Sequence, residues 1–236
     1  MRRTAEGWVL EGTKCVVVGA PSAHRLIVSA RSGTDPSAGA SLFVVDPTLP
    51  GVALNPSRTV DGLRVADVHF DKVNLGADTL LGPPGGALPF IEEATDFATA
   101  LLCAEAVGAM QYANDATLEY LKTRKQFGAP IGANQVLRHR MVEMVIVTEQ
   151  ARSLAILAAG KVDAGTDAKQ RQRAVSAAKV KIADAARQVS QEAVQLHGGM
   201  GMTEELKISH TFRRLTMLAQ RFDDADHHLE RYAKLA

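Results

Sequence analysis

The most constraining feature of the sequence is a change of hydrophobic period at residues 82–86, which read Gly-Pro-Pro-Gly-Gly. Before this segment, short runs of β-branched residues alternate with turns that contain glycine or proline, which is typical of strands. After it, apolar residues recur every three or four positions, as on one face of a helix. The sequence therefore predicts an α+β chain. We expect a partial antiparallel β-domain over residues 1–82 and an up-and-down four-helix bundle over residues 83–236.

The predicted strands of the first part are too few to close a sheet. A small sheet with unpaired edges has to be covered, because bare edges invite pairing with other chains. We therefore expect that the rest of this β-domain is absent or comes from another chain. A turn is expected at Glu11-Gly12-Thr13, and strands are expected over residues 8–10, 14–18, 25–30, 41–45 and 65–70.

Three long helices dominate the prediction for the second part. The first would be ~50 Å long at about 1.5 Å per residue, and Asp167 is the expected N-cap of the third. Helices are expected from about Leu88 to Lys122, from Gln135 to Val162, from Ala168 to Leu196, and over residues 204–218 and 224–235.

Each long helix carries a stripe at helical spacing that we expect to face the bundle core. The cations of the third helix, Lys179 among them, are interpreted as a solvated face. His227 and His228 are interpreted as surface residues, since adjacent helical residues face different ways. The stripes are Phe90, Ala94, Phe97, Leu101, Ala104, Gly108 and Gln111 on the first helix, Leu137, Met141, Met144, Thr148, Ala151, Ala155, Ala158 and Val162 on the second, and Val175, Ala178, Ile182, Ala185, Val189 and Ala193 on the third.

Composition argues against several classes of protein. Lysine and arginine number 27 against 26 aspartate and glutamate residues, and this net charge of +1 argues against nucleic-acid binding. No apolar run reaches the roughly 18 residues of a membrane helix, so we expect no membrane span. Cys15 and Cys103 lie far apart, without metal-type spacing. We therefore predict no metal site, two cysteines that pack as small hydrophobic residues, and a cytoplasmic location.

Two stretches rich in glycine and amides point to a binding surface. Residues 124–135 read Arg-Lys-Gln-Phe-Gly-Ala-Pro-Ile-Gly-Ala-Asn-Gln, and residues 195–202 read Gln-Leu-His-Gly-Gly-Met-Gly-Met. Each has a simpler interpretation, a helix–helix turn for the first and a helical C-cap for the second. In an antiparallel bundle, however, the first and third helices end on the same side. Together the two stretches would form one surface for a phosphate and a purine or flavin.

These stretches also carry a specific resemblance. Arg-Lys-Gln-Phe-Gly-x-Pro-Ile-x-x-x-Gln, followed about 60 residues later by Gln-Leu-His-Gly-Gly-Met-Gly-Met-x-x-Glu, resembles the acyl-CoA dehydrogenase family. Gly-Trp-Val-Leu-Glu-Gly-Thr-Lys at residues 7–14 and the segment 61–73 resemble the family's middle β-domain. The resemblance covers essentially the whole chain. It implies that the family's N-terminal α-domain and the start of its β-domain are missing here.

The resemblance implies a flavin enzyme of lipid metabolism. The family uses FAD to desaturate the Cα–Cβ bond of an acyl-CoA thioester, with a carboxylate taking the α-proton while the β-hydrogen leaves as hydride to the flavin. It also implies a homo- or hetero-oligomer, such as a dimer of dimers, with FAD at subunit interfaces and an electron-transfer protein as acceptor. Arg124 matches the arginine at the pyrophosphate of a neighbour's FAD. The residues that match the family's cofactor contacts are Arg124, Gln126, Phe127, Ile131, Asn134, Gln135, Gln195 and Gly199.

The sequence departs from the family at the positions of the catalytic base and of the contacts to the flavin ring. The family glutamate of a Tyr-Glu-Gly-Thr-like motif falls on Phe222, and the alternative base of some members falls on Ala98. Asp223 is a substitute candidate, although it is one residue away and its side chain is shorter. Val16 and Val18 stand where the family has a tryptophan and a threonine against the flavin ring, and neither can stack or donate a hydrogen bond.

Two main hypotheses follow. In the first, the chain is a subunit of a heteromeric FAD-dependent acyl-CoA dehydrogenase, as in actinobacterial heteromers that act on steroid side-chain thioesters. It would lend Arg124, Phe127, Gln195 and Gly199 to a flavin that its partner mainly holds. In the second, it is a non-enzymatic helical interaction module or a truncated, inactive family member. A third alternative is a relative that uses FAD for oxygen chemistry and needs no glutamate.

Overall fold

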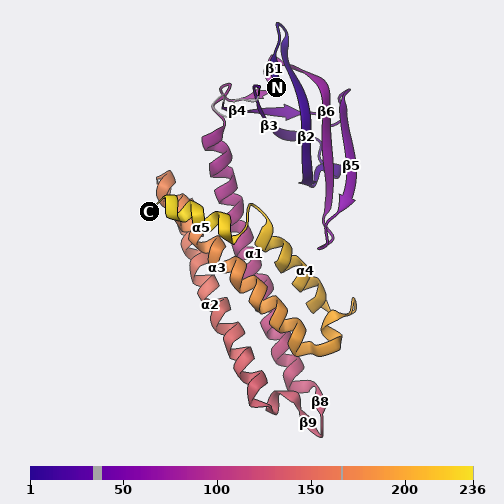
Figure 1. The fold of residues 1–236 in the computed structure, drawn as a ribbon, viewed down its shortest axis with the longest axis vertical. Helices are drawn as coiled ribbons and strands as arrows, with labels where there is room; N and C mark the ends of the chain where they lie inside the picture. Colours follow the sequence, from indigo (N-terminus) through magenta and orange to yellow (C-terminus); the bar gives the residue numbers. More distant parts are fainter. Residues whose placement is uncertain (34–38, 166, 236) are drawn as a thin grey trace. The chain divides into compact units, whose positions relative to one another are not determined.

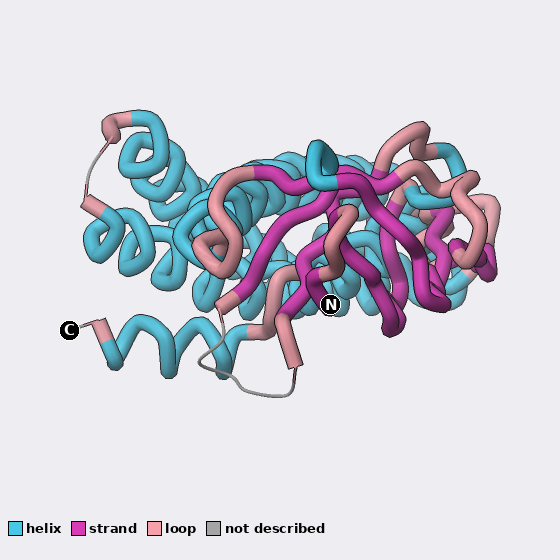
Figure 2. Tube along the Cα trace, turned by 90° about the horizontal axis from the view of Figure 1, so that it is seen from above, coloured by secondary structure: helices cyan, strands magenta, loops and turns pink. Residues whose placement is uncertain are grey.

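The computed structural model describes residues 1–33, 39–165 and 167–235, and it divides the chain into two compact units, Met1–Glu92 and Glu93–Ala236. The first unit holds the sheets and the second holds the helical bundle (Figure 1). The longest helix begins in the last residues of the first unit. Antiparallel strands before a bundle of helices confirm the predicted α+β fold class. Figure 2 shows the same chain coloured by secondary structure.

The described residues of the first unit form two antiparallel sheets. The larger has the order β1-β2-β6-β5 and the smaller has the order β3-β4-β7. Their inward-facing side chains form one core, in which the rings of Trp8 and Phe43 meet edge to face with centroids 5.6 Å apart. The strands are β1 (Arg2–Arg3), β2 (Gly7–Val18), β3 (Leu26–Arg31), β4 (Ala40–Val45), β5 (Val52–Arg58), β6 (Arg64–Gly76) and β7 (Leu80–Leu81).

The predicted turn at Glu11-Gly12-Thr13 is wrong, because β2 continues through it. Pairing with β6 shifts register between Leu10 and Gly12 and again between Lys14 and Val17. Each break in the pattern is therefore a β-bulge, in which one strand carries an extra residue and bends. In the first bulge β6 carries the extra residue, and Lys72 there has a positive φ of 49°; in the second β2 carries it, and Val16 has a positive φ of 52°.

Strand β5 was not predicted from the sequence. It contains Asn55-Pro56-Ser57, a combination that reads as a breaker. In the structure β5 is the edge strand of its sheet, next to β6. An edge strand tolerates proline, since the missing N–H can face away from the neighbouring strand.

In the described part of the second unit the chain forms five α-helices, and their bounds lie close to the predicted ones. They are α1 (Leu88–Thr123), α2 (Gln135–Asp163), α3 (Ala168–His197), α4 (Lys207–Gln220) and α5 (Ala225–Lys234). Asp167 caps α3 as predicted, because its carboxylate accepts the Gln170 N–H at 3.1 Å. Between α1 and α2 the chain forms a small hairpin of β8 (Lys125–Gln126) and β9 (Ala129–Pro130), and then a 3-10 turn at Ile131–Ala133. A 3-10 turn at Gly198–Met202 follows α3.

The predicted core faces are confirmed for α2 and α3 and wrong for α1. Met144, Thr148 and Ala151 on α2 are completely buried, as are Val175 and Val189 on α3. The stripe predicted for α1 faces outward, and half or more of the Phe90, Phe97 and Leu101 side chains is exposed. The buried face of α1 consists instead of mostly small residues, Ala100, Cys103, Ala106, Val107, Met110 and Ala113.

Two groups assigned to the surface are buried. Lys179 on α3 is 2% exposed and donates from Nζ to the carbonyl oxygens of Leu218 at 2.6 Å and Arg221 at 2.7 Å. His228 on α5 lies 2.8 Å from the Phe222 carbonyl oxygen through Nε2 and 3.3 Å from Ser176 Oγ through Nδ1. Burial lowers the pKa of both side chains. These bonds fasten the turn between α4 and α5 to α3, whereas His227 is exposed as predicted.

A buried carboxylate joins three helices. Asp96 on α1 is 1% exposed, and its two oxygens accept hydrogen bonds from Arg171 of α3 at 3.0 Å and from Arg231 of α5 at 2.7 Å. The one buried carboxylate of Asp96 is therefore shared by two guanidinium groups. The ion triad therefore fixes the start of α1 within the second unit against α3 and α5.

The two cysteines differ in their exposure to solvent. Cys103 is buried as predicted, and burial raises the pKa of its thiol to about 11. Cys15 is exposed, contrary to the prediction, because β2 presents it on the side of the strand away from the core.

Over the described residues, no helix has both the length and the apolar character that a membrane crossing demands.

Replacing Asp96 by Asn should lower the free energy of unfolding by about 3 kcal/mol, because two poorly hydrated guanidinium groups lose their counter-charge. Urea denaturation measures the change. The matched control is Asp184→Asn in the exposed Asp184–Arg187 pair, which should cost less than about 0.5 kcal/mol. Equal losses in the two variants would contradict the role assigned to Asp96.

Stability should fall as the pH drops below about 6.5, in part through His228. Desolvation is the main cause of its lowered pKa, the charges of Lys179 and Arg231 act in the same direction, and the Phe222 carbonyl opposes them. Across this window the unfolded chain binds more protons than the folded chain, so the free energy of unfolding rises with pH.

Urea denaturation at several pH values between about 5 and 7 tests this effect. His228→Asn should show a weaker pH dependence than the wild type. His227→Asn changes an exposed histidine on the same helix and should keep the wild-type dependence. A His228→Asn variant with the wild-type slope would refute the prediction.

Candidate functional site

The two glycine-rich stretches meet at one end of the bundle. A cavity of about 520 Å³ opens there, where α1 and α3 end and α2 begins. Five of the eight predicted cofactor residues line it, namely Arg124, Gln126, Ile131, Gln195 and Gly199. The remaining lining residues are Tyr120, Leu137, Arg140, Leu196, His197, Gly198 and Met200.

Arg124 is held in place through its backbone, while its side chain has no partner among the residues that the structure describes. Its N–H donates to the Tyr120 carbonyl at 2.9 Å, and its own carbonyl accepts the Ile131 N–H at 2.9 Å. Over residues 1–33, 39–165 and 167–235, its guanidinium has neither a carboxylate nor a hydrogen-bond acceptor. An exposed arginine of this kind is ready to bind an anion from outside the chain.

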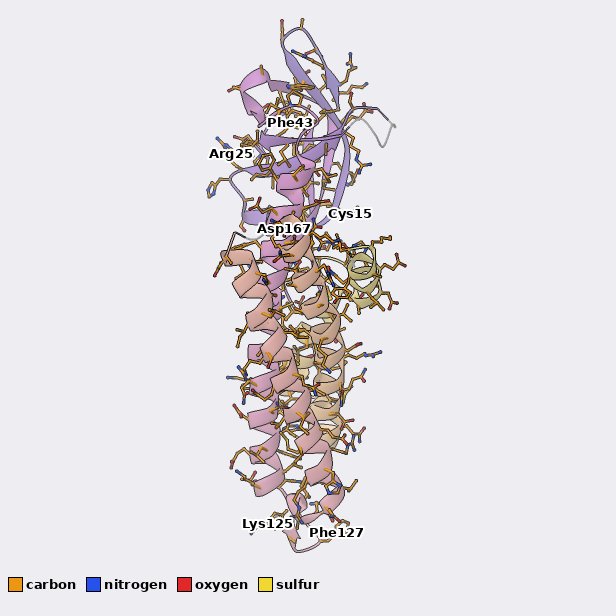
Figure 3. The ribbon with its side chains drawn as sticks, turned by 90° about the vertical axis from the view of Figure 1, so that its left-hand side faces the viewer. Cys15, Arg25, Phe43, Lys125, Phe127 and Asp167 are labelled. Atoms are coloured by element: carbon orange, nitrogen blue, oxygen red, sulfur yellow. The ribbon has the colours of Figure 1, made fainter. Side chains whose placement is uncertain are left out.

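Phe127 occupies the tip of the hairpin (Figure 3). Phe127 and Gly128 both have positive φ angles, 51° and 84°, as in the two-residue turns that match the twist of a hairpin. For phenylalanine this conformation is strained, and the side chain is fully exposed. Phe127 does not line the cavity. The chain thus holds a large aromatic ring in solvent at a conformational cost.

Asn134 and Gln135 also lie outside the lining of the cavity. Asn134 is the N-cap position of α2, and its Nδ2 donates to the Ile131 carbonyl at 3.0 Å. Gln135 is the first residue of α2, and both side chains are exposed. Their role as cofactor contacts stays a prediction.

The glycines of the second stretch are used in different ways. A Cβ on Gly201 would lie 2.5 Å from the Val194 carbonyl oxygen, so close backbone packing requires glycine there. A Cβ on Gly199 would meet nothing within 4 Å. Gly199 has no positive φ angle either, so neither packing nor conformation within the chain demands glycine at this position. It leaves space in the wall of the cavity for a closely approaching ligand.

Of the seven lining residues outside the prediction, three carry polar side chains, namely Tyr120, His197 and Arg140. Tyr120 lies four residues before Arg124 on α1, a spacing that places both on one helical face and could have revealed it. Its ring packs against that of His197, with centroids 4.4 Å apart. Burial lowers the pKa of His197, and its Nδ1 lies 2.8 Å from the Ala193 carbonyl oxygen. The third residue, Arg140, belongs to neither stretch.

The family's catalytic positions carry no carboxylate that faces this cavity. Phe222 is partly buried and packs against the bundle core, and Ala98 lies on α1 next to the buried Thr99. Asp223 is exposed, with Oδ2 3.5 Å from His227 Nε2. Phe222 and Asp223 both have positive φ angles, 55° and 71°. Asp223 therefore stays a candidate base that no contact in the chain supports.

The positions expected to face a flavin ring lie on β2. Val16 sits in the bulge of β2 between Lys14 and Val17, where its N–H donates to Asp67 Oδ1 at 2.8 Å. Val16 and Val18 are 56% and 39% exposed. The strand thus offers two exposed apolar side chains, without a donor for a polar ring atom.

Two protein-family models match the chain. The model described as "Acyl-CoA dehydrogenase, C-terminal domain" matches residues 88–220, and the model described as "Acyl-CoA dehydrogenase, middle domain" matches residues 1–73. Among curated proteins, the chain is 29% identical over 216 residues to the human mitochondrial short-chain specific acyl-CoA dehydrogenase. That alignment covers 90% of this chain and 52% of the relative.

Solved structures agree with these matches. A PigA structure with FAD and proline is 25% identical, with a TM-score of 0.91 over 99% of this chain and 61% of that one. The Tcur3481–Tcur3483 steroid ACAD, a G363A variant, is 29% identical, with a TM-score of 0.84 over 98% and 60%. The chain spans little more than half the length of its curated relatives. Because the C-terminal family model alone covers more than half of the sequence, the chain belongs to the acyl-CoA dehydrogenase family.

Proposed function

We propose that the chain is a subunit of an FAD-dependent acyl-CoA dehydrogenase and that it contributes cofactor contacts rather than the catalytic base. The observation that carries the proposal is the cavity at the end of the bundle. There Arg124, which has no partner in the described chain, shares a wall with Gln195 and Gly199. Arg124 directly follows α1, Gln195 lies in the last turn of α3 and Gly199 lies in the 3-10 turn after it, so segments far apart in the sequence share this wall.

The residues of this end of the bundle fit the chemistry of FAD. A free guanidinium suits a diphosphate, because its fork of donors matches phosphate oxygens. The amides of Gln126 and Gln195 can bond the edges of a ring or a ribose. Phe127 offers a face for stacking, and Gly199 leaves room for a close approach. When bound, FAD would supply the hydride acceptor for α,β-dehydrogenation of an acyl-CoA thioester.

Phe127 points to a site that another subunit completes. The ring of Phe127 is exposed to solvent and gains no packing contacts within the described chain, and its backbone is strained. The outward stripe of Phe97 and Leu101 on α1 is a second unpaired apolar surface. We therefore propose a homo- or hetero-oligomer, such as a dimer of dimers, in which the cavity faces a flavin held mainly by a partner.

The catalytic base is assigned to the partner. Phe222 and Ala98 cannot accept a proton, and Asp223 is exposed beside His227.

An electron-transfer protein would then reoxidise the flavin of the complex. We place this complex in the cytoplasm, where Cys15 and Cys103 would remain as free thiols.

A second candidate is a non-enzymatic helical interaction module. The absence of a carboxylate at Phe222 and Ala98 favours it, as does the exposed stripe of α1. The two candidates differ in one observable property, which is whether any complex that contains this chain holds flavin in stoichiometric amounts.

Co-purification with candidate partner subunits should yield a complex with the absorption spectrum of bound flavin. Arg124→Ala should lower FAD retention roughly tenfold, since a charge-assisted contact to phosphate is lost. Lys122→Ala removes an exposed cation from the last turn of the same helix and should have little effect. Flavin-free complexes with every partner would favour the interaction module, and unchanged retention in Arg124→Ala would reject the role of Arg124.

Phe127→Gly should weaken flavin retention in the complex without destabilising the chain. Glycine adopts positive φ freely, so the free energy of unfolding should stay constant or rise by up to about 1 kcal/mol. Gly128→Ala is the control, because its φ of 84° makes any side chain costly. It should lower the free energy of unfolding by about 1 kcal/mol. A Phe127→Gly chain that unfolds more easily and retains flavin normally would overturn the assignment.

A further inference from the structure

Arg140 lines the same cavity as Arg124, although neither glycine-rich stretch includes it. It lies on α2, and its Nε donates to Glu192 Oε2 of α3 at 2.6 Å. Glu192 precedes Gln195 by three residues, about one helical turn, so the two share a face of α3. The Arg140–Glu192 pair therefore borders the wall that Gln195 provides.

Most of the donors of Arg140 are unused. A guanidinium has five N–H groups, and Glu192 accepts only from Nε. Within the described chain no second acceptor bonds Arg140. By contrast, Arg214 engages Glu105 through both Nε and Nη2. The Nη1 and Nη2 groups of Arg140 are therefore available to bind an anion in the cavity while Nε stays hydrogen-bonded to Glu192.

The pair adds little to the stability of the bundle. The Arg140 and Glu192 side chains are 32% and 29% exposed, and ion pairs with this exposure contribute about 0–1 kcal/mol. Arginine is cationic at any physiological pH, and the hydrogen bond to Glu192 raises the pKa of Arg140 further. A permanently charged arginine held by one bond at the edge of a cavity is better explained by ligand binding than by helix packing.

We propose that Arg140 is a second anion-binding residue of this cavity and that Arg140 and Arg124 together bind the diphosphate of a dinucleotide. Glu192 orients Arg140 and, as a nearby anion, also competes with the ligand for it. The assignment rests on the proposed function in one respect, namely that the ligand carries phosphate. It adds to that function a second cation, Arg140 on α2, and a carboxylate, Glu192 on α3, that competes with the ligand for this cation.

The test uses ADP, which carries the adenosine and diphosphate without the flavin, titrated into the full chain by calorimetry. Arg140→Gln should weaken ADP binding roughly tenfold, the effect of one charged hydrogen bond. Arg140→Lys should restore part of the affinity. Glu192→Gln should strengthen binding about threefold, because removal of the competing charge outweighs the loss of orientation. Arg138→Gln is the matched control, since Arg138 lies on the same helix outside the cavity lining, and it should change the affinity less than about twofold.

Three results would overturn the assignment. The first is an Arg140→Gln chain that binds ADP like Arg138→Gln. The second is a Glu192→Gln chain that loses as much affinity as Arg140→Gln, since that identifies the pair as a helix–helix contact alone. The third is a wild-type chain that does not bind ADP at about 1 mM.

The flavin spectrum of the complex separates this assignment from the proposed function. If flavin retention depends on Arg124 while Arg140→Gln leaves ADP binding unchanged, only the role of Arg140 fails. If the chain binds ADP through Arg140 but no complex holds flavin, the proposed function fails and the anion-binding residues stand.

Discussion

Close packing of small side chains along α3 is the constraint on which the bundle depends. Ala178, Ala185 and Ala193 alternate with Val and Ile on its buried face, so neighbouring helices can approach closely. Long helices packed in this way have little freedom to slide, because each ridge of side chains sits in a groove of the next helix. The ends of α1 and α3 therefore lie side by side, and this register brings Arg124 and Gln195 to one cavity.

Charged groups are buried and paired near the start of α1 but exposed near its end. Near its start, Asp96 is buried and paired with Arg171 and Arg231, and Lys179 and His228 close the neighbouring turn from α4 to α5. Near its end, Arg124 is left without a partner in the described chain. Buried charges that are satisfied internally hold a structure, whereas exposed unpaired ones are free for a ligand. The contrast supports a structural role for the first end and a binding role for the second.

The helices and their ends were predictable because capping residues and glycine act locally. Asp167 begins α3 and the Gly198-Gly199 segment follows its end, as their chemistry demands. The inward face of α1 was not predictable, because Phe97 and Leu101 form a more hydrophobic stripe than the alanines that are buried. Which face of α1 is buried depends on the helices packed around it rather than on α1 itself. Lys179 was misjudged for the same reason, since its acceptors, Leu218 and Arg221, are 39 and 42 residues away.

By itself, the sequence determined the order of sheets and helices, the resemblance to the acyl-CoA dehydrogenases, and which residues match that family's cofactor motifs. These properties depend on local period, capping and residue type, and each can be read along the chain. Only the tertiary structure decided which face of α1 is buried, that Phe127 is held in solvent, and that Arg140 joins Arg124 at one cavity. Each of these depends on contacts between elements far apart in sequence, and side-chain identity alone does not specify such contacts.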